Sequence, residues 1–421
     1  MKKMYIYIIL FFITISFAYS QKLTLEKCYE LAVQKSPITK QKELYTKSSG
    51  LEIDKLSSIY YPQVKLQASA TYQSDVFKFP FSIPMFDIPT PPNDQYQASI
   101  QVNQLIYEGG FVSNSIESQQ NAKKSNLSNV EINLRNLKEI ITNFYFSALS
   151  LQETEKIYNT VLSNLENRMN QIESLVSNGV VLKSSKDALK IEILKTKQNI
   201  YKVQMDKNTV LKNLSEFLEI EDIENNELEI PKLIENFDKN ISKRPEFDLF
   251  NAQKDYFASN RNAVNSQLLP TLSFFAKGGV GKPNPFNFMD TDFKFFYILG
   301  LNLQWTLWDW NSVSNSKEVL EINQEIVQTQ EENFEKNLNI TLYKEINDFE
   351  KYNELIKKDE EIIKLQQNIV DVSFSQFKNG EITSTEYLQE LNILTQSRIN
   401  LELHKIQKIN SVANWMVKSG N

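Results

Sequence analysis

Histidine and cysteine each occur once in the 421 residues, as His404 and Cys28. A Ser-His-Asp triad, a Cys-His pair and a zinc site each need more of these side chains than the chain offers. His404 lies between Glu402 and Lys405 on a helical stretch, where we expect it to be solvated. No glycine-rich phosphate loop is present either. We therefore expect no enzyme activity, no cofactor and no metal.

Glycine and proline are also scarce, with ten and twelve residues, and two long stretches have neither. Residues 111–178 and 311–379 contain no helix breaker, and their apolar residues recur at steps of three and four. That spacing predicts helices with a heptad seam, each about 100 Å long at about 1.5 Å per residue. Asn178-Gly179 and Asn379-Gly380 end them, and a second helix follows each turn.

The charge balance excludes several protein classes. The chain has 46 basic and 52 acidic residues, with 41% hydrophobic and 23% charged residues. This composition is typical neither of a helical membrane protein nor of a disordered chain, and no basic stripe indicates nucleic acid.

The one long apolar run lies at the N-terminus. Lys2 and Lys3 precede an apolar segment that ends at Ala18-Tyr19-Ser20, which predicts a signal peptide over residues 1–20. We expect the mature chain to start near Gln21 and to carry no lipid, because Cys28 lacks the small-residue context of a lipid-modified cysteine. Cys28 is expected to be a small core hydrophobe.

Four segments alternate with a period of two, which predicts β-strands with one apolar and one polar face. They lie at about 63–73, 96–106, 271–279 and 295–307. The fourth has aromatic residues near its ends and leucine between them, as a lipid-facing strand of a membrane barrel does. Its expected lipid-facing residues are Tyr297, Leu299, Leu301, Leu303 and Trp305. A hairpin on a soluble β-sandwich would also alternate, so the pattern alone leaves both open.

The same plan occurs twice, which favours the membrane interpretation. Ser36-Pro37 and Arg244-Pro245 each open a helix, and Tyr61-Pro62 and Leu269-Pro270 each lead into a strand. We predict a first repeat over 21–230 and a second over 231–421. The predicted fold is mainly α with a small transmembrane β part, each repeat being a β-hairpin plus long coiled-coil helices. Four strands cannot close a barrel in lipid, so the chain must contribute its strands to an oligomer.

Six short segments stand in a specific order and spacing along the mature chain: Leu-Thr-Leu-Glu-Lys-Cys from Leu23, Tyr-Pro-Gln-Val from Tyr61, Gln-Leu-Ile-Tyr-Glu-Gly-Gly from Gln104, Arg-Pro-Glu-Phe from Arg244, Leu-Pro-Thr-Leu from Leu269 and Phe-Lys-Asn-Gly-Glu-Ile-Thr-Ser from Phe377. Through these segments the chain resembles the TolC family of outer-membrane efflux proteins over essentially its whole mature length. The resemblance implies a homotrimer with a 12-stranded barrel continued by a periplasmic α-helical barrel. It also implies a periplasmic adaptor (a membrane fusion protein) and an inner-membrane pump of the RND, ABC or MFS type.

The family pattern is broken at one place. Where relatives have an apolar-Phe-Asp-Gly-Gly run after the fourth strand, this chain has Leu307-Trp308-Asp309-Trp310-Asn311. Because the glycines are missing, we expect the bend from strand to helix to be made differently there.

The turns between long helices are the predicted tips of the channel, farthest from the membrane, and the predicted adaptor-docking sites. They comprise Asn178, Gly179, Val180 and Val181, and Asn379, Gly380, Glu381 and Ile382. Ile382 stands where an arginine helps to lock some relatives. The resemblance places a periplasmic gate near these tips, with Glu386 as a ring of carboxylates facing the pore and Phe377 narrowing the bore. Gln389, Ser184 and Ser185 occupy the other gate positions. A plain structural role for the turns and a solvent-facing Glu386 remain open.

The function that follows is the exit duct of a tripartite efflux or type I secretion system. It would lie in the outer membrane of a Gram-negative (diderm) bacterium, in contact with its lipid and with a large periplasmic part. A secreted structural coiled-coil protein of the cell envelope is the alternative, and it predicts release from membranes by high salt or carbonate.

Overall fold

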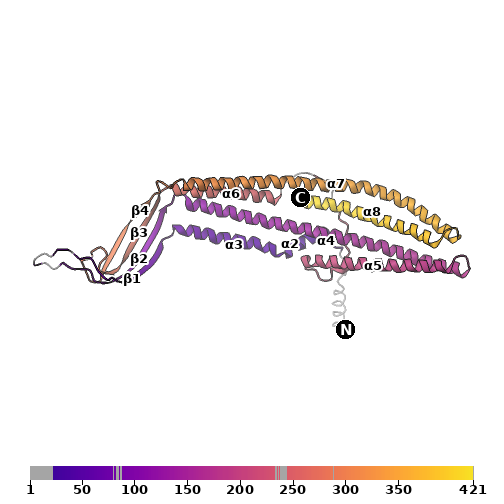
Figure 1. The fold of residues 1–421 in the computed structure, drawn as a ribbon, viewed down its shortest axis with the longest axis horizontal. Coiled ribbons are helices and arrows are strands. Elements are labelled where there is room, and N and C mark those ends of the chain that lie inside the picture. The colour runs from indigo at the N-terminus through magenta and orange to yellow at the C-terminus, as the bar shows by residue number, and fades with distance from the viewer. Residues whose placement is uncertain are drawn as a thin grey trace, which may run out of the picture. The chain divides into compact units, whose positions relative to one another are not determined.

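The structure is a computed structural model, and it describes residues 22–78, 80–81, 85, 88–232, 235, 237, 244–287 and 289–420. The predicted signal peptide lies outside the described residues. The described chain forms long helices and one small sheet (Figure 1). None of the helices in these ranges has both the length and the apolar character that a membrane span requires.

The helices come in pairs of equal length, one from each half of the chain. Helices α3 (Pro37–Ser57) and α6 (Pro245–Asn265) have 21 residues each, and α4 (Phe111–Ser177) and α7 (Ser312–Lys378) have 67 each. Helices α5 (Lys183–Leu218) and α8 (Ser384–Ser419) have 36 each. The short helix α2 (Leu25–Lys35) has no counterpart in the described residues of the second half and starts at an N-cap, Thr24, whose hydroxyl accepts a hydrogen bond from the Lys27 N–H.

The described chain divides into two compact units that do not coincide with the two sequence repeats. One unit comprises residues up to Gln41, Val130–Pro245 and the chain from Asn333 onward, and the other comprises Lys42–Asn129 and Glu246–Glu332. Each unit therefore draws segments from both repeats.

The second unit contains the sheet, which has four antiparallel strands in the order β1-β2-β3-β4. The strands are β1 (Gln63–Tyr72), β2 (Asp94–Tyr107), β3 (Thr271–Lys282) and β4 (Lys294–Gln304). Short 3-10 turns, Ser58–Tyr60 and Ser266–Leu268, lead from α3 and α6 toward β1 and β3. The outer sides of β1 and β4 pair with no strand among the described residues.

The third and fourth strands end at other residues than the sequence predicts. β4 stops at Gln304, whose partner is Thr271, because Pro270 comes next on β3 and has no N–H to donate. Trp305 and Leu307 therefore lie outside the strand. β3 continues to Lys282, where its pairing with Tyr96 on β2 still holds it, and Pro283 follows.

Both long helices begin at a carboxylate that caps the chain as it leaves the sheet. Glu108 accepts hydrogen bonds from the backbone N–H groups of Gly110 and Val112, and Asp309 accepts them from Asn311 and Val313. Such acceptors satisfy helix N–H groups that have no partner within the helix.

The bend after the fourth strand is not made differently, so that expectation is wrong. Gly109 and Gly110 have φ of 70° and 87°, and Trp310 and Asn311 have φ of 56° and 62° at the matching positions. The second bend thus keeps the left-handed backbone that glycine adopts without cost, and a tryptophan adopts it under strain.

The first unit has two apolar cores. One lies around α2, where Cys28 is fully buried, as predicted; burial is the main reason that the pKa of its thiol rises to about 12. Beside it, Gln152 holds the backbone of Leu228 through two hydrogen bonds, of 2.9 and 3.1 Å. The other core, which we call the tip core, joins α4, α5, α7 and α8 near their turns; its fully buried members include Leu165, Ile172, Leu189, Val370, Phe377 and Tyr387.

Candidate functional site: a two-faced sheet and two helical tips

One face of the sheet is apolar and open. The register places the alternate residues of all four strands on this face: Val64, Leu66, Ala68, Ala70, Tyr72; Tyr96, Ala98, Ile100, Val102; Leu272, Phe274, Ala276, Gly278, Val280; Phe295, Tyr297, Leu299, Leu301, Leu303. Leu66 and Leu301 are 76% and 66% exposed. A soluble monomer seldom leaves so many large apolar side chains in one uncovered patch.

The opposite face is polar along most of its length. It presents the amide, hydroxyl and lysine side chains that alternate with the apolar set, among them Gln67, Ser69, Gln97, Gln101, Asn103, Ser273, Asn302 and Gln304. Phe275 interrupts it and covers Gly300, where a Cβ atom would come within 3.0 Å of the phenyl ring. At the loop end, Phe296 is buried and meets Phe286 edge-on at 5.6 Å.

Three tryptophans follow the end of β4. Trp305, predicted as the last lipid-facing residue of the strand, is exposed but lies beyond it, and its indole N–H donates to the Leu268 carbonyl oxygen at 3.0 Å. Trp308 and Trp310 are exposed and meet edge-on at 5.8 Å. Exposed tryptophans beside an apolar face are typical of the interface between lipid and water.

The two predicted tips are turns of the same construction. Gly179 and Gly380 have φ of 73° and 76°, and the residue after each donates a hydrogen bond of 2.9 Å to a carbonyl five residues earlier. This arrangement closes a helix end on a left-handed glycine. A Cβ atom at either glycine would meet nothing within 4 Å, so the backbone conformation alone favours glycine there.

The side chains at the tips differ in exposure. Val180 is exposed, whereas Val181 and Ile382 pack against the tip core. Leu182, which is not among the predicted docking residues, is 75% exposed next to Val180. The sequence signal for Leu182 is its position. It is the N-cap residue of α5, whereas the N-cap residue of α8 is the polar Thr383.

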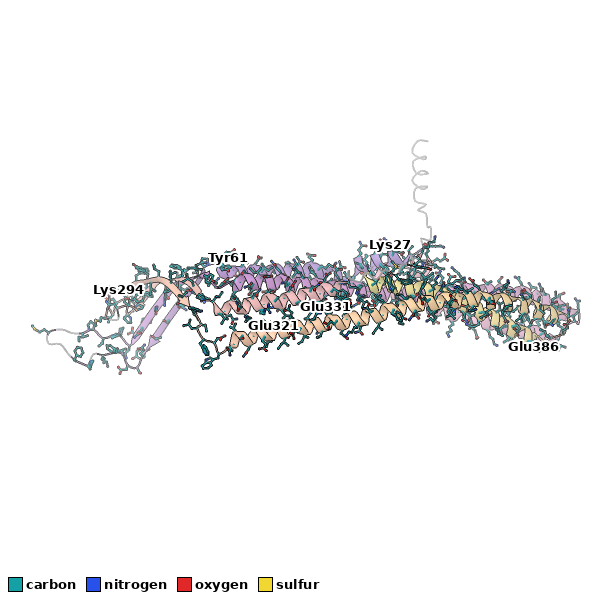
Figure 2. The ribbon with its side chains drawn as sticks, turned by 90° about the horizontal axis from the view of Figure 1, so that it is seen from above. Lys27, Tyr61, Lys294, Glu321, Glu331 and Glu386 are labelled. Atoms are coloured by element: carbon teal, nitrogen blue, oxygen red, sulfur yellow. The ribbon has the colours of Figure 1, made fainter. Side chains whose placement is uncertain are left out.

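Glu386 lies beside the second turn, in the first turn of α8 (Figure 2). Its carboxylate accepts hydrogen bonds from the backbone N–H and the hydroxyl of Thr383, at 2.7 and 2.9 Å, and thereby forms a capping box. The backbone hydrogen bond is the larger reason, and the hydroxyl the second, that the pKa of Glu386 lies below its usual value. The carboxylate is exposed as well as capping, so a gate role for it stays a prediction.

Phe377 does not have the surroundings expected of a residue that narrows a bore. It is 2% exposed and stacks on Tyr387, with ring centroids 6.0 Å apart, inside the tip core. Ser185 is buried as well, whereas Ser184 and Gln389 are exposed. The ring of Phe377 is thus covered by its own chain, because its position on α7 faces α8.

His404 is only partly exposed and is paired with a carboxylate, whereas a freely solvated side chain was expected. Its Nδ1 lies 2.6 Å from a carboxylate oxygen of Asp359 on α7, and its ring lies 5.8 Å from that of Tyr352. The residue therefore links α8 to α7. Within the described ranges no group of three or more His, Cys, Asp or Glu side chains is arranged to hold a metal ion.

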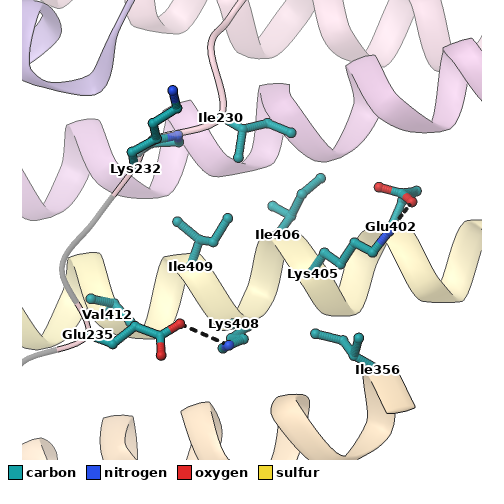
Figure 3. A pocket seen from close by; sticks show the side chains of 11 residues that line it. Ile230, Lys232, Glu235, Ile356, Glu402, Lys405, Ile406, Lys408, Ile409 and Val412 are labelled. Atoms are coloured by element: carbon teal, nitrogen blue, oxygen red, sulfur yellow. Dashed lines mark hydrogen bonds and ion pairs between the residues drawn. The ribbon is translucent and has the colours of Figure 1, made fainter. Parts of the chain in front are cut away.

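A pocket of about 450 Å³ lies in the first unit, lined by helices α7 and α8 and by Ile230, Pro231, Lys232 and Glu235 (Figure 3). Its floor is apolar, and two of its lysines are paired: Lys405 with Glu402 and Lys408 with Glu235, each at 2.9 Å. The third lysine of the lining is Lys232, and the other lining residues are apolar.

The comparisons with known proteins agree with this geometry. Residues 28–218 match the family described as outer membrane efflux protein. The fold is similar to that of VceC from Vibrio cholerae, with a TM-score of 0.72 at 12% identity over 94% of this chain and 96% of that one. It is also similar to the MtrE outer membrane channel of Neisseria gonorrhoeae in its open state, with a TM-score of 0.71 at 12% identity over 94% of this chain and 89% of that one.

The CmeC outer membrane channel of Campylobacter jejuni gives a TM-score of 0.70 at 13% identity, with 94% of this chain and 85% of that chain covered. No curated protein matches the chain in sequence. At such identities the solved structures establish the fold of the chain.

Proposed function

Because the chain belongs to the outer membrane efflux protein family, we propose that it is the exit duct of a tripartite efflux or type I secretion system. It carries substrates from an inner-membrane pump across the periplasm and the outer membrane. The observation that supports this most directly is the sheet with one exposed apolar face and one polar face. The helical part of the chain belongs to the periplasm, and the protein resides in the outer membrane of a Gram-negative bacterium.

The two-faced sheet suits a wall between lipid and water. Leu299, Leu301 and Leu303 would face acyl chains, while Gln101 and Asn302 on the other side would face a water-filled lumen. Backbone groups in lipid must be paired, yet the outer sides of β1 and β4 have no partner strand in the described sheet. A homotrimer would pair both edges. Three copies bring twelve strands, and β4 of one copy would pair with β1 of the next.

The helical tips are the proposed docking sites of the partners. Members of the family work with a periplasmic adaptor and a pump, and the two turns expose short apolar and polar side chains, among them Val180, Leu182 and Glu381. A pump of the RND, ABC or MFS type would supply the energy. The described residues contain no group that would provide it.

Membrane integration tests this proposal. Leu301→Arg places a charge on the apolar face, and a charged side chain facing the middle of the bilayer costs about 2–4 kcal/mol. Asn302→Arg places the same charge on the polar face of the same strand and serves as the matched control. We expect the Leu301→Arg protein to be lost from carbonate-washed envelopes and the Asn302→Arg protein to stay.

The purified wild-type chain should also form ion-conducting channels in planar bilayers. A secreted structural coiled-coil protein would be washed off envelopes by carbonate in all three forms and would conduct no current. That result would overturn the proposed function.

A further inference from the structure

The charged residues of the sheet are distributed unevenly between its two faces. Only five occur on the four strands, and Asp94 is the single acid among them. Asp94 lies on the apolar side at the loop end, where Lys282 pairs with it at 3.2 Å. The polar face carries the other three charges, all of them lysines: Lys65, Lys277 and Lys294.

Two of these lysines lie in one row across the sheet. Lys65 on β1 and Lys277 on β3 both pair with Gln101 on β2. Strands lie about 4.8 Å apart, so the two lysine backbones stand roughly 10 Å from each other on the same face. Their neighbours in the row are Gln101 and Ile298, neither of which carries a charge.

Nothing in the described part of the chain neutralises this row. Lys294, nearer the loop, pairs with Asp290 at 3.6 Å, whereas Lys65 and Lys277 form no ion pair among the described residues. The two positive charges repel each other, and together they produce a positive electrostatic potential that attracts anions within about one Debye length.

We propose that Lys65 and Lys277 form a basic row on the water-facing side of the sheet that favours the passage of anionic solutes. The inference rests on the proposed function, because only a closed barrel turns the polar face into a lumen. In a trimer the three copies would bring six lysines to the wall of the lumen, three from Lys65 and three from Lys277, with no carboxylate from the strands to offset them. The substrate class it indicates is organic or inorganic anions.

A cysteine beside the row reports its local potential. Gln101→Cys places a thiol between the two lysines, and the natural Cys28 is fully buried with its pKa raised to about 12, so it stays unreactive. The full-length protein in lipid vesicles is treated with a sulfonate-bearing and a trimethylammonium-bearing methanethiosulfonate. The ratio of the two modification rates is the measurement.

We expect the ratio of anionic to cationic modification to fall roughly tenfold at about 0.1 M salt when Lys65→Gln and Lys277→Gln are added. Lys65→Arg with Lys277→Arg keeps the charges and should preserve the ratio. Lys282→Gln removes a lysine of the other side, already paired with Asp94, and should leave the ratio within about twofold of its starting value. A ratio that the double glutamine variant does not change would overturn the proposal.

Channel recordings separate this inference from the proposed function. In planar bilayers, hexacyanoferrate added from the loop side should block the wild type more strongly than the double glutamine variant. If both proteins conduct and are blocked equally, the proposed effect of the basic row on anions is wrong, while the proposed function as an exit duct is unaffected. Absence of any conductance in the wild type would reject the duct, and with it the role of the row in transport.

Discussion

The guanidinium of Arg168 on α4 lies over the ring of Tyr387 on α8, 5.0 Å from its centroid. The same guanidinium lies 4.0 Å from the ring centroid of Phe374 on α7. The Arg168 side chain therefore connects α4 to both α7 and α8, next to the turns that we propose as docking sites. Burial is the main reason that the pKa of Tyr387 rises to about 12, so its ring stays neutral at physiological pH.

Replacing Arg168 should loosen the tip. We expect Arg168→Gln to lose about 1 kcal/mol of local stability, because a partly buried cation over aromatic faces contributes about that much. Hydrogen exchange in residues 370–390 should quicken accordingly, while exchange around Cys28 stays unchanged. Arg168→Lys, which keeps a charge, should show a smaller effect. Equal exchange rates in the wild type and both variants would show that the Arg168 contact does not stabilise the tip.

A second polar contact, between Glu155 and Lys207, predicts a dependence on pH. Glu155 breaks the apolar seam of α4 and receives hydrogen bonds from Lys207 at 2.6 Å and Gln204 at 2.7 Å on α5. Burial works to raise the pKa of Glu155, but these two hydrogen bonds and the positive charge of Lys207 together outweigh it and lower the pKa. Its contribution is therefore present above the ordinary carboxylate pKa and is lost as the pH falls through the lower pKa of the folded state.

We expect Glu155→Gln to cost about 1–2 kcal/mol at pH 7 and less in acid, where the wild type loses the same interaction. Urea unfolding followed by the helical signal, at pH 7 and pH 3.5, measures this. Glu166→Gln is the matched control, because the Glu166–Lys197 pair at 2.9 Å is half exposed on both sides and should contribute a few tenths of a kcal/mol. A difference that does not shrink in acid would contradict the assignment.

The strained bend at Trp310 predicts a stabilising substitution. A non-glycine residue at φ of 56° costs about 1–2 kcal/mol relative to a relaxed backbone, so Trp310→Gly should raise the stability by about 1 kcal/mol after the entropy that glycine adds to the unfolded chain. Thermal unfolding in detergent reports the change. Trp308→Gly loses the same Trp–Trp contact without relieving strain, so its midpoint should fall instead. A lower midpoint for Trp310→Gly would show that the indole contributes more than the strain costs.

If Glu386 forms a carboxylate ring at the periplasmic gate, its charge should govern selectivity there. Glu386→Gln should weaken both the preference for cations at that end and the block by multivalent cations, in single-channel recordings. Because the pKa of Glu386 is lowered, the wild-type preference should persist as the pH falls through the usual carboxylate range and disappear only below it. Glu381→Gln, in the neighbouring turn, is the control. Unchanged selectivity in Glu386→Gln would leave the residue with its capping role alone.

Adaptor docking at the tips predicts a cross-linking pattern. Val180→Cys exposes a thiol on the first turn, and Glu381→Cys exposes one on the second; Ile382 is a poorer position because it packs against the tip core. Both variants should cross-link to a periplasmic adaptor in cells. A cysteine at Asp75, in the loop after β1, should not. Equal cross-linking from all three would contradict the predicted orientation.

The sequence by itself determined the elements, because each depends on local signals. The period of two marks the strands, and the absence of glycine and proline over residues 111–178 allows one unbroken helix. The glycines at 179 and 380 mark the turns, because glycine readily adopts the left-handed backbone that ends both helices here. These signals need no knowledge of which segments meet in space.

Only the tertiary structure decided what individual side chains do. Phe377 and His404 were expected to be accessible, yet the first is covered by Tyr387 and the second is paired with Asp359, 45 positions earlier in the chain. Lys65 and Lys277 share a row although 212 positions separate them, because the register of three strands brings both to Gln101. Burial, pairing and charge clustering arise from contacts between distant segments, and helical or strand periodicity constrains only the face on which a residue lies.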